Sequence, residues 1–347
     1  MLKQLGVASL LLLSFGVAAH HSRTTFFDMS QTVELAGEIT RVQWRHPHVR
    51  YWLQADPEYG GALWELETTP PSLLERQGIG PDILAAGTRV RVAGPPSRLV
   101  EHAMEVSHVL LPDGREVLLH TGRAPMWTEN TVERAVQGFD EAAVRAAEAT
   151  ANGIFRVWSR PGAGPEERPP FWLDSYPLTE AAQAASAAWD PVTGTETGCS
   201  PKVMPELMAS FWPFEFVDEG DRLRLRAEEF DQERIIRLAG TTGEVSPSPL
   251  GYSLGYWEEG ELVVLTTDIN SLDFGRVGIP LSEDVQTLER FRLSPDERRL
   301  DYEITVTDPA TFTEPVTMSS YWIWQPGETI KPYDCVETPG SWTNRAD

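Results

Sequence analysis

The sequence has few positive charges. Only three lysines occur in 347 residues, and the formal net charge is −23. A chain of this charge repels nucleic acid and anionic lipid surfaces, so we expect neither as a partner. An acidic surface is typical of solubility or salt tolerance, and recognition of a cationic partner is the alternative interpretation.

The motifs of several well-known sites are also missing. The sequence has no phosphate-binding loop, dinucleotide fingerprint, H-E-x-x-H pair or zinc-finger spacing. Gly251–Gly255 matches G-x-S-x-G, but that nucleophile elbow needs a strand–turn–helix context and a later His, and no His follows Ser253. A glycine-flanked turn or bulge in a strand explains this segment better.

The first residues have the pattern of a signal peptide. Lys3 precedes an apolar run from Leu5 to Val17, and Ala19 ends a small-residue cleavage site. The run is too short for a transmembrane helix, and no later stretch reaches the roughly 20 apolar residues that one needs. We therefore expect residues 1–19 to be removed and the mature protein to be periplasmic or secreted, without a transmembrane segment.

Two cysteines, Cys199 and Cys335, are present. In an oxidising compartment such a pair is most simply a disulfide. A metal or redox pair is the alternative, but the two cysteines lack the C-x-x-C spacing that favours it.

The hydrophobic pattern predicts a mainly β protein with a few helices. Within residues 20–122, three strands, a helix and two strands follow one another, which is the order of an OB-like small barrel. Residues 201–347 carry about seven strands joined by short turns, which predicts an antiparallel β-barrel with a lipocalin-like meander. The expected strands cover residues 33–44, 49–55, 62–66, 88–93, 102–110, 223–230, 234–238, 250–257, 262–267, 285–293, 300–307 and 316–324.

Residues 123–200 form a helical and Pro-rich connector in this interpretation. The segment 126–160 is rich in Ala, Glu and Arg with apolar residues near helical spacing, and residues 178–189 predict a second short helix. Residues 161–170 between them are rich in Pro, Gly and Glu, as linkers are.

Several short motifs of the N-terminal region resemble one exported bacterial family. They are His20-His21-Ser22, Phe27-Asp28, Leu35-Ala36-Gly37, Val42-Gln43-Trp44, Pro47-His48 and the run from Leu111 to Arg115. This pattern, over about residues 19–120, resembles the domain-of-unknown-function family DUF6152. The later run Pro249–Trp257 is similar to a β-rich C-terminal half found in some members. Typical members have Asn where this chain has His46, and the resemblance implies a location and a domain but no activity.

Potential metal ligands are concentrated near the mature N-terminus. Cleavage after Ala19 would give His20 a free amine, which can chelate one ion together with the Nδ1 of its ring; a further imidazole would complete a histidine brace. Cleavage one residue earlier would leave His21 in the third position, and that arrangement also binds Cu(II) or Ni(II). His46 and His48 are two residues apart, so an extended segment would point them the same way.

Nitrogen ligands in a square plane favour copper. The sequence therefore predicts a copper site formed by His20, His21, His46 and His48. The alternatives are an unstructured His-rich terminus and a hydrogen-bonded His48 at a strand start. His102, His108 and His120 are interpreted as ordinary surface or rim residues of the barrel.

The C-terminal half carries a second group of candidate residues. Charged groups near strand ends and aromatic groups on one strand could bind a small apolar or aromatic ligand, and barrels of this kind often hold one. These residues are Glu228, Arg234, Tyr252, Tyr256, Trp257 and Asp268. Cross-strand surface pairs and core packing are the ordinary alternatives.

These features favour a non-catalytic envelope binding protein over an enzyme. A copper-dependent oxidase, or a barrel enzyme acting on a hydrophobic substrate, is the second hypothesis. A structural or assembly protein is the third, and a barrel filled by its own side chains would favour it.

Overall fold

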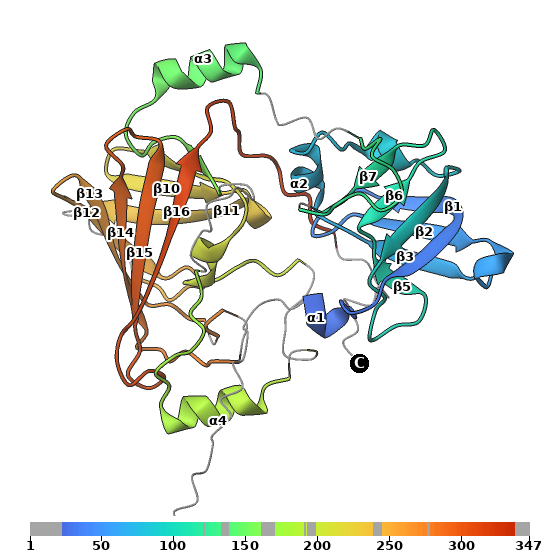
Figure 1. Cartoon of the computed structure of the whole chain (residues 1–347). Helices are drawn as coiled ribbons and strands as arrows, with labels where there is room; N and C mark the ends of the chain where they lie inside the picture. The colour runs from blue at the N-terminus through green and yellow to red at the C-terminus, as the bar shows by residue number, and fades with distance from the viewer. Residues whose placement is uncertain are drawn as a thin grey trace, which may run out of the picture.

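The computed structural model describes residues 23–120, 122–132, 139–160, 171–190, 192, 199–238, 245–271, 273–275 and 278–336. The chain is mainly β, as the sequence predicts. Figure 1 shows an N-terminal domain in blue to teal beside a C-terminal barrel in yellow to red. The short helix α2 (Pro71–Glu75) lies on the side of the N-terminal domain that faces the barrel.

The N-terminal domain is a seven-stranded sheet in the order β5-β3-β2-β1-β4-β6-β7. β1 pairs antiparallel with both β2 and β4, whereas β3 pairs parallel with β5. The predicted order of three strands, a helix and two strands is confirmed, but the last strand is divided in two and one short strand follows it. The strands are β1 (Val33–Gln43), β2 (Arg50–Ala55), β3 (Leu63–Glu67), β4 (Arg89–Gly94), β5 (Ala103–Glu105), β6 (His108–Leu110) and β7 (Glu116–Leu118).

Alternating apolar residues of these strands form one core. Ile39, Leu53, Leu66 and Met104 are almost completely buried, and each contributes roughly 1.5–3 kcal/mol by leaving water. Gly94 ends β4 where a Cβ would collide with the backbone oxygen of Glu105. The missing side chain therefore lets β4 approach β5 closely, which brings Glu105 to the edge of the domain core.

The C-terminal domain is a closed barrel in the order β10-β11-β12-β13-β14-β15-β16-β8-β9. Strand β15 shows why it closes around a core, since Leu300, Tyr302, Ile304 and Val306 alternate inward. The strands are β8 (Val157–Ser159), β9 (Phe214–Asp218), β10 (Arg222–Ala227), β11 (Gln232–Leu238), β12 (Tyr252–Glu258), β13 (Glu261–Thr267), β14 (Gln286–Leu293), β15 (Arg299–Thr307) and β16 (Val316–Trp324).

The barrel differs from the predicted meander in two details. Strands β8 and β9 were not predicted, and β8 comes from the segment interpreted as a connector. The pair β11–β12 is parallel, with Ile236 opposite Ser253, whereas every other pair in the barrel is antiparallel. The barrel is therefore mostly but not wholly antiparallel.

Helices are few and short. α3 (Glu141–Thr150) starts at Asp140, whose side chain accepts a hydrogen bond from Ala142 N, and α4 (Glu180–Ala188) starts at Thr179 in the same way. Among the described residues of 126–160, the helical spacing corresponds to a helix at Glu141–Thr150. The backbone N–H groups of residues 126–128 donate to the buried carboxylate of Glu116 instead of to a helix. The remaining helix, α1 (Arg23–Phe26), opens the described chain, and no described helix is long and apolar enough to cross a membrane.

After β16 the chain leaves the barrel and crosses to the N-terminal domain, which it reaches beside α2 (Figure 1). We call residues 325–336 the C-terminal strap. Near its end, Cys335 lies within disulfide distance of Cys199, with the sulfurs 2.13 Å apart. The strap therefore connects both domains.

Candidate metal centre

His48 lies just before β2 and bonds to the end of β3. Its Nδ1 is 3.1 Å from the carbonyl oxygen of Thr68. Because a carbonyl oxygen only accepts, Nδ1 carries the proton in this bond. The lone pair of a neutral ring then lies on Nε2, and the side chain is 41% exposed. His48 thus has the tautomer and the access that a metal ligand requires.

His120 follows β7 and is held in the same tautomer. The hydroxyl of Thr69 donates to the carbonyl oxygen of Leu119 at 2.6 Å, so its oxygen accepts from Nδ1–H of His120 at 3.2 Å. Burial, with a smaller contribution from the nearby charge of Arg23, lowers the pKa of His120 to about 3. The ring is therefore neutral at physiological pH, with its lone pair on Nε2.

Two carboxylates accompany these rings. Glu67 and Glu105 are opposite each other in the parallel pair β3–β5. Glu105 Oε1 is 3.5 Å from Nε2 of His120, and Glu67 Oε1 is 3.8 Å from Nδ1 of His48. Since the two rings are bonded to the consecutive residues Thr68 and Thr69, the four side chains form one group, which we call the His48–His120 cluster.

Arg23, the first residue that the structure describes, contacts this cluster. The guanidinium of Arg23 binds the carboxylate of Glu105 through two nitrogens. Arg98 also donates to the backbone oxygen of Thr24 at 3.1 Å, which fixes the start of the chain against the domain. The predicted ligands His20 and His21, like the predicted signal peptide, lie outside the described residues.

His46 has different surroundings from His48. Its ring stacks on Tyr333 of the strap, with centroids 3.8 Å apart, and only 4% of the residue is exposed. Burial lowers the pKa of His46 to about 4 although Glu228 opposes the shift. The ring contacts the strap, whereas the ring of His48 contacts Thr68 and Glu67.

Two further histidines have structural surroundings. His108 uses both ring nitrogens, since Nδ1 is 2.8 Å from Ser107 Oγ and Nε2 is 3.1 Å from the carbonyl oxygen of Ala124. His102 occupies a turn with a φ of 57° and has an edge contact with Trp64. Neither ring belongs to the cluster.

The sequence interpretation overlooked His120, Glu67, Glu105 and Arg23. An acidic residue directly after the buried Leu66 was an available signal, because acids at buried strand positions are rare without a partner. Nothing in the local sequence distinguishes His120 from a rim residue. Within the described ranges, no three His, Cys, Asp or Glu side chains are arranged to hold a metal ion by themselves.

The charged residues proposed for a barrel ligand are bound to the protein itself. Arg234 is 2% exposed and donates to Glu289, to Ser253 Oγ at 3.1 Å and to Thr266 Oγ1 at 2.8 Å. Glu228 accepts from Arg76 in the N-terminal domain at 2.8 Å.

The remaining candidates of that group have other contacts. Asp268 accepts from Thr267 Oγ1 at 2.6 Å. Tyr252 lies under the guanidinium of Arg237, and Tyr256 and Trp257 are 42% and 46% exposed. These contacts do not bring the six residues to one site.

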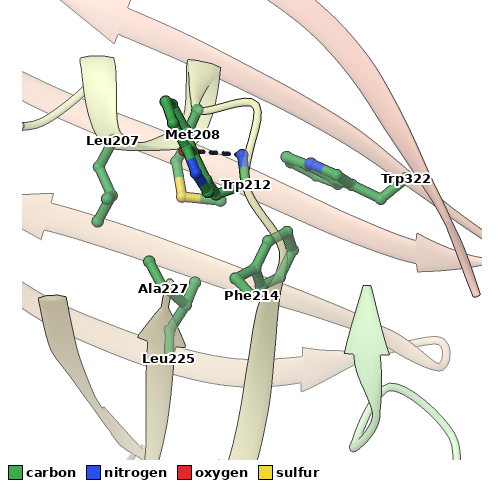
Figure 2. A pocket seen from close by; sticks show the side chains of 8 residues that line it. Leu207, Met208, Trp212, Phe214, Leu225, Ala227 and Trp322 are labelled. Carbon is green, nitrogen blue, oxygen red and sulfur yellow. Dashed lines mark hydrogen bonds between the residues drawn. The ribbon is translucent and has the colours of Figure 1, made fainter. Parts of the chain in front are cut away.

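Figure 2 shows an apolar pocket where a short 3-10 helix, Glu206–Ala209, covers the barrel. Its free volume is about 10 Å³, close to the minimum for a single water molecule. The pocket therefore has no room for a small organic ligand. Its lining residues are Leu207, Met208, Ser210, Trp212, Phe214, Leu225, Ala227 and Trp322.

Comparison with known proteins agrees with the resemblance of the N-terminal region. Residues 8–104 match the profile of a family of unknown function, DUF6152. No curated protein and no solved structure matches the chain.

Proposed function

We propose that the chain, whose N-terminal part matches DUF6152, is an exported binding protein that holds Cu(II) at its mature N-terminus. The proposed ligands are the amine and Nδ1 of His20 and the Nε2 atoms of His48 and His120. Four nitrogens in a plane suit Cu(II). His120 replaces His46 in the set expected from the sequence, because His46 is stacked under the strap. If cleavage occurs after Ala18 instead, His21 takes the third position and supplies the terminal imidazole.

The ion pair of Arg23 with Glu105 is the observation that carries this proposal. Consecutive Cα atoms are 3.8 Å apart, so the Cα of His20 is within about 11 Å of that of Arg23. Arg23 binds the carboxylate that is 3.5 Å from His120. Covalent geometry therefore allows the mature terminus to reach the cluster.

The hydrogen bonds of the two rings support the same proposal. Histidines that bind metals usually donate their second ring N–H to a carbonyl, carboxylate or water, which fixes the tautomer. Thr68 O and Thr69 Oγ1 accept these protons here. The carboxylates of Glu67 and Glu105 are each paired with an arginine, Arg50 and Arg23, so the proposal rests on the ring nitrogens and not on these carboxylates.

The test is a Cu(II) titration of protein exported by its own signal, with the mature N-terminus identified by mass spectrometry. We expect tight binding of one ion and electron paramagnetic resonance lines from several nitrogens. A variant with one extra residue before His20 loses the amine ligand and should bind much more weakly. Equal weak binding by both proteins would contradict the proposal.

Substitutions separate the ligands from the other histidines. His48→Asn and His120→Asn should each lower the affinity by about tenfold or more, the range seen when a ligand or its support is lost. His102→Asn is the matched control, because Asn tolerates the positive φ of that turn. An effect of the control as large as that of His120→Asn would exclude a site at the cluster.

The barrel acts as a scaffold in this proposal. Its interior is filled by aromatic side chains, with the rings of Phe214 and Trp322 4.8 Å apart and those of Phe291 and Tyr302 4.9 Å apart. The buried pair of Arg234 and Glu289 adds a polar centre to this core. A packed interior supports a structural role for the C-terminal domain more than binding of a small apolar ligand.

A further inference from the structure

The end of the strap forms a small sheet-like contact with the N-terminal domain. The backbone N–H of His46 donates to the oxygen of Asp334 at 3.1 Å, and Val336 N–H donates to the oxygen of His46 at 3.0 Å. Cys335 is the residue that bridges His46 in this contact. Cys335, which is linked to Cys199, is therefore also the strap residue that pairs with His46.

Both ends of the strap are fixed to the barrel side of the molecule. At one end it continues from β16, and at the other end Cys335 is linked to Cys199. Cys199 lies three residues before Lys202. The backbone of Lys202 forms two hydrogen bonds with the side chain of Gln232 in β11. The disulfide thus closes a covalent loop that spans the segment around His46.

The loop also contacts both domains along its length. Arg76 of the N-terminal domain donates to Glu328 at 3.1 Å, and Lys331 N–H donates to Glu228 of the barrel at 3.0 Å. Tyr333 N–H donates to the carboxylate of Asp231. The strap therefore covers His46 and holds the two domains together.

We propose that the Cys199–Cys335 disulfide is a redox latch that keeps the strap over His46. Reduction opens the loop, releases the end of the strap around Tyr333–Val336, and exposes the ring of His46 to solvent. Both cysteines are partly exposed, so a thiol can reach them.

The reaction needs a dithiol reductant. One of its thiolates attacks a sulfur of the disulfide and forms a mixed disulfide, and its second thiolate then displaces the protein sulfur. The dithiol becomes a disulfide, and two electrons and two protons are transferred to give Cys199 and Cys335 as thiols.

Release follows reduction because the contacts left at the strap end are noncovalent and can break and re-form one at a time. They include the two backbone hydrogen bonds, the bond of Tyr333 N–H to Asp231, and an ion pair between the exposed side chains of Arg45 and Asp334. The ring of Tyr333 also contacts His46, Trp212 and Phe230, and these contacts must open for His46 to be exposed. The closed state also has a cost, since within the described part of the chain Nδ1 of His46 is buried without a hydrogen-bond partner. Solvent would satisfy that nitrogen once the strap moves.

The test compares oxidised protein with protein reduced by a dithiol and alkylated, and with Cys199→Ser/Cys335→Ser. Diethyl pyrocarbonate labels accessible imidazoles, and mass spectrometry reports each site. We expect labelling of His46 to become at least ten times faster in both reduced forms. The rate at His102 should be unchanged, as should hydrogen exchange of the barrel peptide 286–293.

A second variant opens the strap without touching the cysteines. Tyr333→Ala removes the ring that covers His46 and should raise its labelling in the oxidised protein, which keeps the proposal testable if the double serine variant does not fold. If His46 stays as protected in reduced and alkylated protein as in oxidised protein, the disulfide is not the latch. Exposure that is accompanied by faster exchange in 286–293 would mean general unfolding and would also overturn it.

An exposed His46 would place a second imidazole two residues from His48. This consequence rests on the proposed copper site, whereas the labelling experiment uses no metal. If reduction makes labelling of His46 faster but leaves the copper affinity unchanged, the proposal of a disulfide latch stands. Only the proposed effect of the latch on the metal site is then rejected.

Discussion

The barrel and the N-terminal domain both bury charged side chains, but these side chains have different hydrogen-bond partners and different exposure to solvent in the two domains. In the barrel, Arg234 is enclosed and its guanidinium is bound to Glu289, Ser253 and Thr266. Tyr302 completes the group by donating to Glu289 at 2.9 Å. Every member of this network is bonded to another member, so the network contributes to structure and offers no atom to a ligand.

In the N-terminal domain, the His48–His120 cluster is exposed to solvent on one side. Glu105 is 6% exposed, but its partner Arg23 reaches solvent with 45% of its side chain, and His48 is 41% exposed. The hydrogen bonds to Thr68 and Thr69 hold the rings while Nε2 keeps its lone pair. A closed polar network of this kind is typical of a scaffold, whereas a half-open one whose ring nitrogens are oriented is typical of a binding site.

The largest effect is expected from breaking the closed network. Arg234→Ala leaves Glu289 charged and buried without its partner, which should lower the free energy of unfolding by about 3–5 kcal/mol. Denaturant unfolding measures this loss. Arg234→Met combined with Glu289→Leu should recover most of it, and neither variant should alter copper affinity.

The open cluster should respond to the loss of a single hydroxyl. Thr69→Val removes the acceptor of His120 Nδ1–H and should weaken copper binding about tenfold, or 1.4 kcal/mol. Thr69→Ser retains the hydroxyl and should bind like the wild type. A titration that gave the same affinity for valine and serine would contradict the role of Thr69 in orienting the ring.

A smaller, pH-dependent effect is expected at Glu229, a buried barrel residue beside Lys202. Burial raises the pKa of Glu229, although the charge of Lys202 opposes the shift. The pKa of Glu229 in the folded protein is therefore above its value of about 4.5 in the unfolded chain. As the pH rises above about 4.5, the folded state loses stability relative to the unfolded state, because the unfolded chain releases this proton more readily. Glu229→Gln should therefore gain stability relative to the wild type as the pH rises above about 4.5, as thermal unfolding at several pH values can show.

The smallest effect is expected on the outer surface of α3. Glu141 and Arg145 form an exposed pair four residues apart, with side chains 89% and 68% exposed. Arg145→Ala should change the free energy of unfolding by less than about 0.5 kcal/mol. A loss above 1 kcal/mol would show that exposed pairs contribute more to this protein than the comparison of the two networks implies.

Much of the fold could be predicted because strands that bury one face have a period of two. The predicted range 300–307 differs from β15 by only one residue, since Leu300, Tyr302, Ile304 and Val306 alternate with polar residues. Strand β8 has only three residues and lies between Gly153 and the Pro- and Gly-rich stretch 161–170. Its partners are far away in the sequence, with Ser159 opposite Ile323, so no local pattern could reveal it.

The candidate site was predictable only in part. The spacing of His46 and His48 identified a histidine-rich segment, but the strap determines the surroundings of His46, and the strap begins almost 280 residues later. His120 joins the cluster through Thr69, which is 51 residues away in sequence. Contacts of this range depend on the tertiary fold, and single-sequence patterns carry no information about them.

The position of β8 between β16 and β9 has a consequence for dividing the chain. The barrel is continuous in space but not in sequence, since residues 157–159 pair with the strands on both sides of them. A fragment that starts at residue 201 would have two strand edges with unpaired N–H and C=O groups, and such edges invite association with other chains. The shortest piece that can close this barrel therefore begins no later than Val157.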